Sequence, residues 1–545
     1  MRMTNKIMQN NSLYNINNNK VLQDKLSTQM STQKKLARPS DDPVVAIRAL
    51  RLRSSVSELT QYQEKNSPDA DSWLKVTAGG LGTVTDILTS LSTNANKASN
   101  KDLTADDLDI IVENMKLLSE EFYSTGNLDY AGRYVFTGYR TNTPMQFTAA
   151  DVANTKEPIP SYEITEQTSI LSFDMVNYTN VGKLAGISQY NYTEAVHEEV
   201  ETNITNNDIH RVRLAYDNLS AEASKVPVIE IVNKVDYDPT TEIYTPDIRK
   251  TYGPASTPPI TIASSADAAY QAVAAANNAT PPTSVILYVP DTGELLFSDE
   301  AYADLDAQIQ ACHGTDTEIR ITYTKSDWNN GDLRPEHYFA CTSTDKIDTT
   351  KQIAYNSEYL TSGKEKQVIA YDVGYNQTIE VNTTADEVFT HNLNRDMDDL
   401  ENALISLKNI DYIKATLKDA LKGIDQKADP TKYDTVSKQL DAANKSYEFI
   451  RQNMHELMGN TITKMQNYLD AANVAVTDNG TRSSRLELIT NRLTEQKTTF
   501  KTLQSQNEDV DIADVAVNLT SAELTYNSSL MATSKIMQTT LMNYI

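Results

Sequence analysis

The sequence predicts a mainly α-helical protein, in which helices from both ends pair antiparallel into a rod or coiled coil and a β-rich outer domain is inserted between them. Two observations lead to this fold class. The last segment, 507–545, carries a seven-residue apolar repeat, typical of a helix that supercoils against a partner. The middle, 146–392, is instead rich in Thr, Pro, Tyr and Asn, with short β-type runs. The helices on either side of it must return to one another, so the middle projects from them.

The C-terminal repeat is polar for a helix seam. Its seven-spaced positions are Val510, Val517, Leu524, Met531, Gln538 and Ile545. The positions between them include Ala513, Thr520, Asn527 and Ser534. A seam this polar is weak in isolation, so we expect several copies to pack together around it. The alternative is that the stripe forms part of the core of a single chain.

The N-terminal region predicts two helices separated by a proline-containing turn. The first runs through about 4–35, with Ile7, Tyr14 and Val21 seven residues apart. The turn at 38–43 ends it: Pro39 breaks the helix, Asp41 and Asp42 offer capping oxygens, and Pro43 fits the first turn of a new helix. The second helix extends to about residue 65, and Pro68 then either kinks or restarts it.

Apolar residues at three-four spacing predict further helices on both sides of the middle. Before it, the stripes cover about 73–91 and 108–122. After it, Pro430 opens a helix to about Val474, a loop follows that ends at Gly480, and a helix with coiled-coil spacing covers 486–503.

The middle carries local strand and turn signals. Residues 285–289 and 294–297 flank a Pro-Asp-Thr-Gly turn and predict a β-hairpin, and 319–323 and 368–371 also predict strands. Upstream of them, Gly132 and Gly138 predict a tight hairpin, with a ligand-binding loop as the alternative.

The charge distribution disfavours some partners. The net charge is −25, which argues against nucleic acid and anionic membranes. The first sixty residues are basic, whereas the last stretch opens with Glu508, Asp509, Asp511 and Asp514. The two ends could attract each other, or these charges could simply be solvated faces.

The two cysteines, Cys312 and Cys341, make no disulfide framework, although they could pair after export. A zinc site that joins them to His313 and His337 fits no common spacing, so we expect no metal. No apolar run follows the basic start and none is long enough to span a membrane, so the chain is cytosolic or exported without a cleaved signal.

No catalytic motif is evident. The stretches that begin at His197-Glu198 and His455-Glu456 lack the second histidine of a zinc-protease helix. We found no nucleophile elbow, phosphate-binding loop or dinucleotide fingerprint. We therefore predict no enzyme activity, no catalytic residue and no cofactor.

Four stretches resemble the hook-associated protein 3 family of the flagellin superfamily, whose members form the junction between flagellar hook and filament. They are the Met-Arg-Met-Thr start with its Asn-rich helix, Leu36–Pro43, the segment Asn127–Tyr139 with its Gly-Arg-Tyr-Val-Phe-Thr-Gly sequence, and 508–545. A weaker match, 379–389, resembles the return from the family's outer domain. The family-motif residues are Arg38, Pro39, Asp41, Asp42, Pro43, Gly132, Arg133, Phe136 and Gly138.

The resemblance implies a structural subunit of the bacterial flagellum. It implies export through the flagellar type III apparatus without a cleaved signal peptide, a cytosolic export chaperone on the C-terminal helix, and an extracellular place in the flagellum. The partners would be a homo-oligomeric ring of about eleven subunits (a family expectation), the other hook–filament junction protein and flagellin. Our candidate assembly residues are Ile7, Tyr14, Val21, Val517, Leu524, Met531, Leu541 and Ile545.

On this resemblance we divide the chain into five segments: 1–60 and 507–545 as inner-tube helices, 61–145 and 393–506 as the two halves of the rod, and 146–392 as the outer insert. Three alternatives stay open: a minor filament flagellin, an adhesin that uses the Tyr-rich insert, and an enzyme in the insert.

Overall fold

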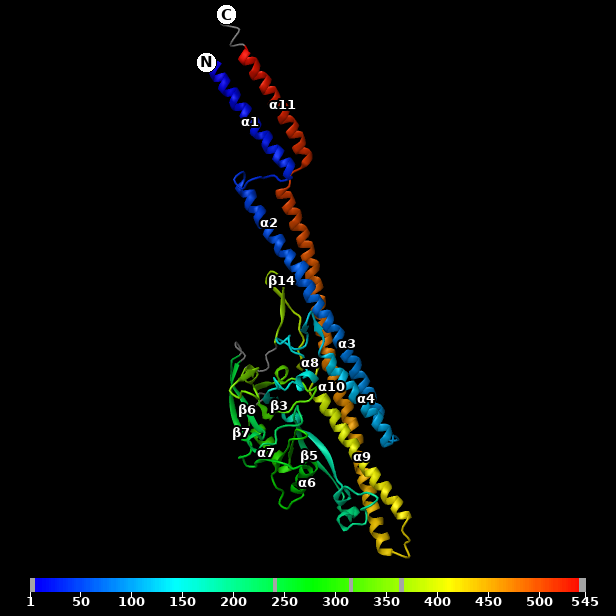
Figure 1. Cartoon of the computed structure of the whole chain (residues 1–545). Helices are drawn as coiled ribbons and strands as arrows, with labels where there is room; N and C mark the ends of the chain where they lie inside the picture. The colour runs from blue at the N-terminus through cyan, green and yellow to red at the C-terminus, as the bar shows by residue number, and fades with distance from the viewer. Residues whose placement is uncertain (1–4, 239–242, 313–316, 362–366, 539–545) are drawn as a thin grey trace. The chain divides into compact units, whose positions relative to one another are not determined.

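The computed structural model describes residues 5–238, 243–312, 317–361 and 367–538. Within these residues the chain is helical toward both ends and rich in β-strands in the middle, as the sequence predicts (Figure 1). It divides into two compact units. The first contains residues 1–71, 370–379 and 482–545, and the second contains 72–369 and 380–481.

The helices are α1 (Asn5–Thr32), α2 (Pro43–Gln61), α3 (Ser67–Ala98), α4 (Ala105–Thr125), α5 (Ala149–Val152), α6 (Ala266–Asn277), α7 (Asp299–Ala311), α8 (Ala385–Val388), α9 (Asn392–Lys422), α10 (Pro430–Glu508) and α11 (Ile512–Gln538). A π-helical turn, Tyr62–Asn66, joins α2 to α3. No helix within the described ranges combines the length and apolarity that crossing a membrane requires.

In the part of the chain that the structure describes, the strands form two larger sheets and two hairpins. They are β1 (Asp129–Tyr130), β2 (Arg133–Tyr134), β3 (Ser161–Thr168), β4 (Asp174–Asn180), β5 (Thr205–Arg213), β6 (Val228–Asp238), β7 (Ile243–Tyr252), β8 (Ile260–Ile262), β9 (Ile286–Val289), β10 (Glu294–Phe297), β11 (Thr317–Lys325), β12 (Ala340–Thr344), β13 (Gln352–Tyr355), β14 (Ala370–Gly374) and β15 (Gln377–Glu380). The five-stranded sheet has the order β4-β5-β10-β9-β8, and the six-stranded sheet has the order β13-β12-β3-β11-β6-β7.

The predicted hairpin at 285–297 is confirmed. β9 and β10 pair antiparallel, with Glu294 opposite Val289 and Phe297 opposite Ile286. Gly293 supplies the positive φ of +62° that the turn needs. The predicted strand at 319–323 lies inside β11, whereas the one at 368–371 begins two residues later as β14.

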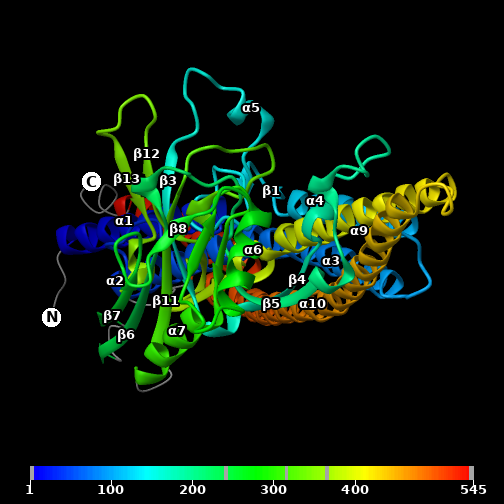
Figure 2. The ribbon, with the colours of Figure 1, turned by 90° about the horizontal axis from the view of Figure 1, so that it is seen from below.

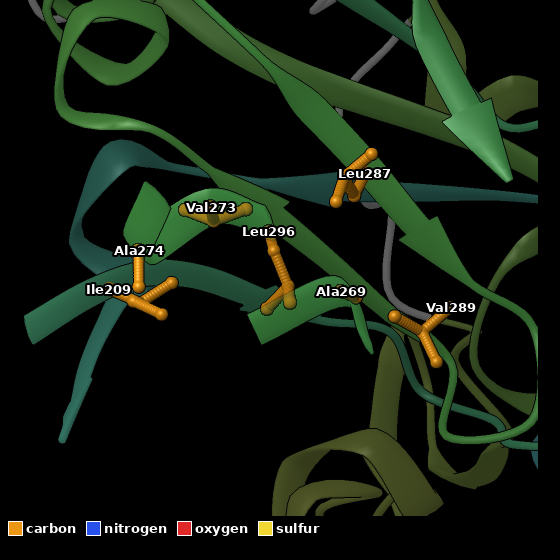
Figure 3. Packing of buried hydrophobic residues seen from close by; sticks show 7 residues of the cluster. All are labelled: Ile209, Ala269, Val273, Ala274, Leu287, Val289 and Leu296. Carbon is orange, nitrogen blue, oxygen red and sulfur yellow. The ribbon is translucent and has the colours of Figure 1, made fainter. Parts of the chain in front are cut away.

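Helix α6 covers one face of the five-stranded sheet. The buried cluster joins three residues of α6 to four on β5, β9 and β10 (Figure 3): Ala269, Val273, Ala274, Ile209, Leu287, Val289 and Leu296. Side chains alternate along a strand, so Phe297, next to Leu296, points to the opposite face and packs against Phe173 with ring centroids 5.3 Å apart.

One helix boundary differs from the prediction. Gly480 lies inside the continuous helix α10, so the predicted loop before it is wrong. A helical Gly costs about 1 kcal/mol, and tertiary contacts offset this: the buried Asn479 amide donates to the Leu74 carbonyl at 3.1 Å. At Pro68 the α-helix restarts, which is one of the two predicted outcomes: α3 begins at Ser67 after the π-helical turn, in which the hydrogen bonding moves by one residue, with Ser67 N bonded to Tyr62 O.

A buried ionic cluster joins β5 and β10 to α9. Arg211 donates to Glu294 at 2.6 Å and to Asp399 at 2.8 Å, and Arg213 donates to Asp396 at 2.6 Å and to Asp399 at 2.7 Å. Burial alone would raise the pKa of Asp399, but the two guanidinium groups hold that pKa well below its ordinary value. The carboxylate therefore stays charged at neutral pH.

Helix α10 joins the same cluster. The Lys464 ammonium lies 3.0 Å from Asp396, and the Tyr468 hydroxyl donates to Asp396 at 2.8 Å. Farther along, Lys414 of α9 lies 3.5 Å from the ring centroid of Tyr447, and Figure 2 shows α9 and α10 side by side. The five-stranded sheet is thus held to α9 by largely buried charge pairs, and α10 joins them through Lys464 and Tyr468.

A second buried carboxyl lies in the six-stranded sheet. Glu166 of β3 accepts hydrogen bonds from Ala215 N at 2.7 Å and from the Tyr323 hydroxyl. Burial raises its pKa to about 7, because desolvation disfavours the charged form more than these two donors favour it.

Removing one carboxylate of the cluster should destabilise the second unit. We expect Asp399→Asn to cost about 3–5 kcal/mol, because it leaves Arg211 and Arg213 buried and underpaired. Urea unfolding of the full chain measures the loss. The matched control is Asp434→Asn, which removes an exposed ion pair with Lys438 and should cost less than about 1 kcal/mol. Equal effects of the two variants would contradict this role of the cluster.

Glu166 should make stability depend on pH. Its folded pKa of about 7 lies above the unfolded value near 4.5, so its contribution is complete below about pH 4.5 and is lost as pH rises to about 7. At about 1.4 kcal/mol per pH unit, the loss is about 3 kcal/mol. Glu166→Gln should remove this slope in urea unfolding between about pH 5 and about pH 8. Glu163→Gln, exposed on the same strand, should keep it, and an unchanged slope in Glu166→Gln would refute the assignment.

Candidate assembly surface

The terminal helices α1 and α11 lie side by side in opposite directions within the first unit. Near the middle of α1, the Asn19 amide donates to the Ser529 hydroxyl at 3.1 Å. Beyond its end, the Lys34 ammonium lies 2.5 Å from Asp509. Within the described residues, the buried apolar contact between the helices is small: Leu26, Val515 and Ala522 are buried, and Val510 and Leu519 pack against them partly buried.

The predicted C-terminal stripe lies on the other face of α11. Val517, Leu524 and Met531 are 70%, 69% and 72% exposed. At 100° per residue they lie about 180° around the helix from Val515 and Ala522, the two residues that face α1. These three side chains therefore take no part in the core of the chain. Leu541 and Ile545 fall outside the described residues.

The N-terminal stripe is exposed as well. Ile7, Tyr14 and Val21 on α1 are 49%, 67% and 69% exposed. Helix α2 buries none of its residues, and its Val44 and Ile47 are in contact with water. The predicted inner-tube segment 1–60 includes α2, but our candidate assembly residues include none from this helix, although the three-residue spacing of Val44, Ile47 and Leu50 was a readable signal.

The turn at 38–43 caps α2 as predicted. Asp42 is the N-cap, and its carboxylate accepts from Val44 N at 3.0 Å and Val45 N at 3.1 Å. Pro43 occupies the first turn, where a missing N–H leaves no donor unpaired. Asp41 accepts from Arg38 N at 3.2 Å and closes the turn, while Pro39 is exposed.

Charges of the two chain ends meet at Glu508. Arg53 of α2 donates to both of its carboxylate oxygens, at 2.7 and 2.6 Å, and Lys34 lies 3.5 Å away. The hydrogen bonds from Arg53 lower the pKa of Glu508. The attraction between a basic start and an acidic end is therefore real at this point, although the sequence could not single out Arg53.

The segment 127–139 forms a tight hairpin, as the glycine pair predicts. β1 and β2 pair through a turn with positive φ at Ala131 and Gly132, +53° and +77°. The guanidinium of Arg133 lies 5.0 Å from the Trp73 ring centroid on α3. Gly138 also has a positive φ, +59°, and the next residue's amide donates to Gln367.

Phe136 anchors this hairpin in the second unit. It is fully buried, and its ring centroid lies 4.9 Å from that of Phe389. Beneath it, Gly80 of α3 has no room for a side chain, since a Cβ there would lie 2.6 Å from Leu128 Cδ1 and 3.2 Å from the Phe136 ring. The signature residues Gly132, Arg133, Phe136 and Gly138 are therefore used in packing and turn geometry.

The described histidine and cysteine side chains are not gathered into a ligand set, and His313 of the zinc alternative lies outside the described residues. Cys312 and Cys341 are both buried free thiols. Burial lowers the pKa of His337 to about 3 and raises that of Cys341. Among the described residues, no group of three or more His, Cys, Asp and Glu side chains could hold a metal ion.

Comparison with known proteins adds a family context. Residues 3–141 match the bacterial flagellin N-terminal helical region. This part of the chain is flagellin-like. The flagellar hook-associated protein 3 of Escherichia coli (strain K12) is 29% identical over 144 residues, which cover 26% of this chain and 45% of that protein. The protein of the same name from Salmonella typhimurium (strain LT2) is 28% identical over 142 residues, 26% and 44% of the two chains.

The chain thus spans less than half the length of the curated relatives it matches. A solved structure, the flagellar hook-associated protein-3 of Legionella pneumophila, is 10% identical over 84% of this chain and 97% of that one, with a TM-score of 0.28.

The flagellin-like segment offers a direct packing test. Gly80→Leu should destabilise the chain by about 1–3 kcal/mol, because the new side chain collides with Leu128 and Phe136. Its control is Gly79→Leu, where nothing lies within 4 Å and the better helix former should stabilise by up to about 1 kcal/mol. Thermal unfolding of both variants measures the difference, and equal shifts would show that the hairpin does not pack closely on α3.

Proposed function

We propose that this protein is a structural subunit of the bacterial flagellum, that it forms the hook–filament junction, and that it assembles through its terminal helices. The observation that carries the proposal is the exposed stripe of Val517, Leu524 and Met531 on α11. It lies in a chain whose N-terminal region matches the flagellin N-terminal helical region and whose relatives in Escherichia coli and Salmonella typhimurium are named flagellar hook-associated protein 3.

The energetics of the stripe support assembly. Full burial of a Val, Leu or Met side chain contributes about 1.5–3 kcal/mol, and Val517, Leu524 and Met531 leave most of this unrealised in a single chain. Ile7, Tyr14 and Val21 add a second unrealised surface on α1. Neighbouring copies that cover both stripes would order these helices as they assemble.

The rod is part of the proposal. Two ion pairs join helices α4 and α9, Lys116 with Glu401 at 2.7 Å and Lys408 with Asp109 at 2.6 Å. The later residue of α4 pairs with the earlier residue of α9, so the two helices run antiparallel. Together with the antiparallel contact between α1 and α11, these pairs support an antiparallel helical rod from which the insert, 146–392, projects. We propose the same five segments as domains: 1–60, 61–145, 146–392, 393–506 and 507–545.

The proposal extends to partners and export. A subunit at this junction would contact a ring of its own copies, the other junction protein and flagellin. Free thiols at Cys312 and Cys341 suit a chain that passes unfolded through the type III export apparatus, because no disulfide need be broken. An export chaperone would cover the exposed stripe of α11 before assembly. The assembled protein would lie outside the cell, in the flagellum.

A charge in the stripe should block assembly and leave the fold intact. We expect Leu524→Asp or Met531→Asp to remove about 2–3 kcal/mol or more from each contact between copies, because an apolar contact is lost and a carboxylate would be buried. The measurement is the fraction of cells with complete flagella, together with urea unfolding of the purified chain.

Thr525→Asp is the matched control, since Thr525 is exposed on the same helix but about 100° around it from Leu524. This control should assemble normally. Normal flagella in the Leu524→Asp and Met531→Asp strains would refute the proposed function.

A further inference from the structure

Helix α4 has an outward face of acidic and apolar residues that nothing in the described chain covers. Asp106, Ile110, Glu113 and Leu117 follow one another by four, three and four residues, so they form one stripe along the helix. Ile110 is 72% and Leu117 is 54% exposed. The buried side of α4 carries Leu108, Val112, Met115 and Phe122, which places the stripe on the opposite side.

Helix α9 extends this surface. The ion pairs of Glu401 and Lys408 with α4 bring the same stretch of α9 beside it. Ile405 lies between these two residues and is 49% exposed, and Tyr412, one heptad later, is 55% exposed. We call the six residues Asp106, Ile110, Glu113, Leu117, Ile405 and Tyr412 the acidic face.

The two carboxylates of the acidic face have no ion-pair partner among the described residues. Asp109 and Lys116, on the flank toward α9, are used in ion pairs. Asp106 and Glu113 make no ion pair with any residue in the described ranges. An apolar surface with free negative charges is suited to a partner helix that carries apolar and positive side chains together.

Helix α2 carries the complementary pattern. Val44, Ile47, Arg48 and Arg51 are spaced by three, one and three residues and are all exposed, which makes them one helical stripe. Arg48 and Arg51 form no ion pair with any residue that the structure describes, in contrast to Arg53, which is bound to Glu508. We call these four residues the basic stripe.

We propose that the basic stripe on α2 of one copy docks on the acidic face of α4 and α9 of a second copy. This inference rests on the proposed self-assembly and names one of its contacts. Burial of the apolar members of both surfaces would supply affinity. The two arginines opposite Asp106 and Glu113 would set the register, since like charges at these positions would repel.

Charge exchange in the full-length chain tests the contact. Arg48→Glu/Arg51→Glu should prevent complete flagella, and so should Asp106→Lys/Glu113→Lys. The chain that carries all four changes should assemble again, because opposite charges meet once more. In the control chain, Arg48→Glu/Arg51→Glu is combined with Asp441→Lys/Asp470→Lys, at exposed carboxylates on α10, and this chain should not recover.

The outcomes separate this contact from the proposed function. If both charge reversals assemble normally while Leu524→Asp fails, the docking of α2 on the acidic face is wrong and the assembly role stands. If neither the reversals nor Leu524→Asp impair flagella, the proposed function itself is wrong. Failure of the fourfold variant, with each reversal harmful alone, would also overturn the docking.

Cross-linking gives a readout that does not depend on motility. In isolated flagella, oxidation of the Arg48→Cys/Glu113→Cys chain should yield disulfide-linked copies of this protein. The Arg48→Cys/Asp470→Cys chain should give none, and the native thiols Cys312 and Cys341 are buried. A cross-linked product that contains flagellin or another protein would overturn the assignment of the second copy as the occupant.

Discussion

Among the described residues, the contact between α1 and α11 buries the apolar side chains of Leu26, Val515 and Ala522, with Val510 and Leu519 partly buried against them. This small apolar contact is the constraint on which the behaviour of the terminal helices depends. Two helices of this length need a broader apolar seam to be firm in water. The seven-spaced side chains that could provide one, such as Leu524 and Met531, lie on the surface of α11 that faces away from α1. Under the proposed function, contacts with other copies would supply the order that this contact does not.

The second unit follows a different physical plan. Its sheets and helices bury large side chains, including Trp73, Phe136 and Phe389, and its two guanidinium groups at Arg211 and Arg213 are matched by carboxylates. Buried charge pairs tolerate little change of geometry, because each unpaired partner is costly. The second unit thus holds its fold through contacts of its own, which suits the proposed role as a building block of an assembly.

Local signals account for what the sequence could predict. The repeat at Val517, Leu524 and Met531 correctly predicted a helix with an exposed face. The Pro-Asp-Thr-Gly turn correctly predicted the β9–β10 hairpin. Both predictions succeeded because spacing and turn chemistry act over a few residues. Long-range contacts account for the misses. The helix through Gly480 depends on Asn479 reaching Leu74, and the pairing of Arg211 with Asp399 joins residues 188 positions apart.

The place of the protein in the flagellum is the central claim, and immunogold electron microscopy of intact flagella tests it most directly. An antibody against residues 146–392 would label the segment that we expect to project from the assembled helices. The account predicts a single band of gold where the hook meets the filament. Label along the whole filament would contradict the junction role and identify the protein as a filament flagellin.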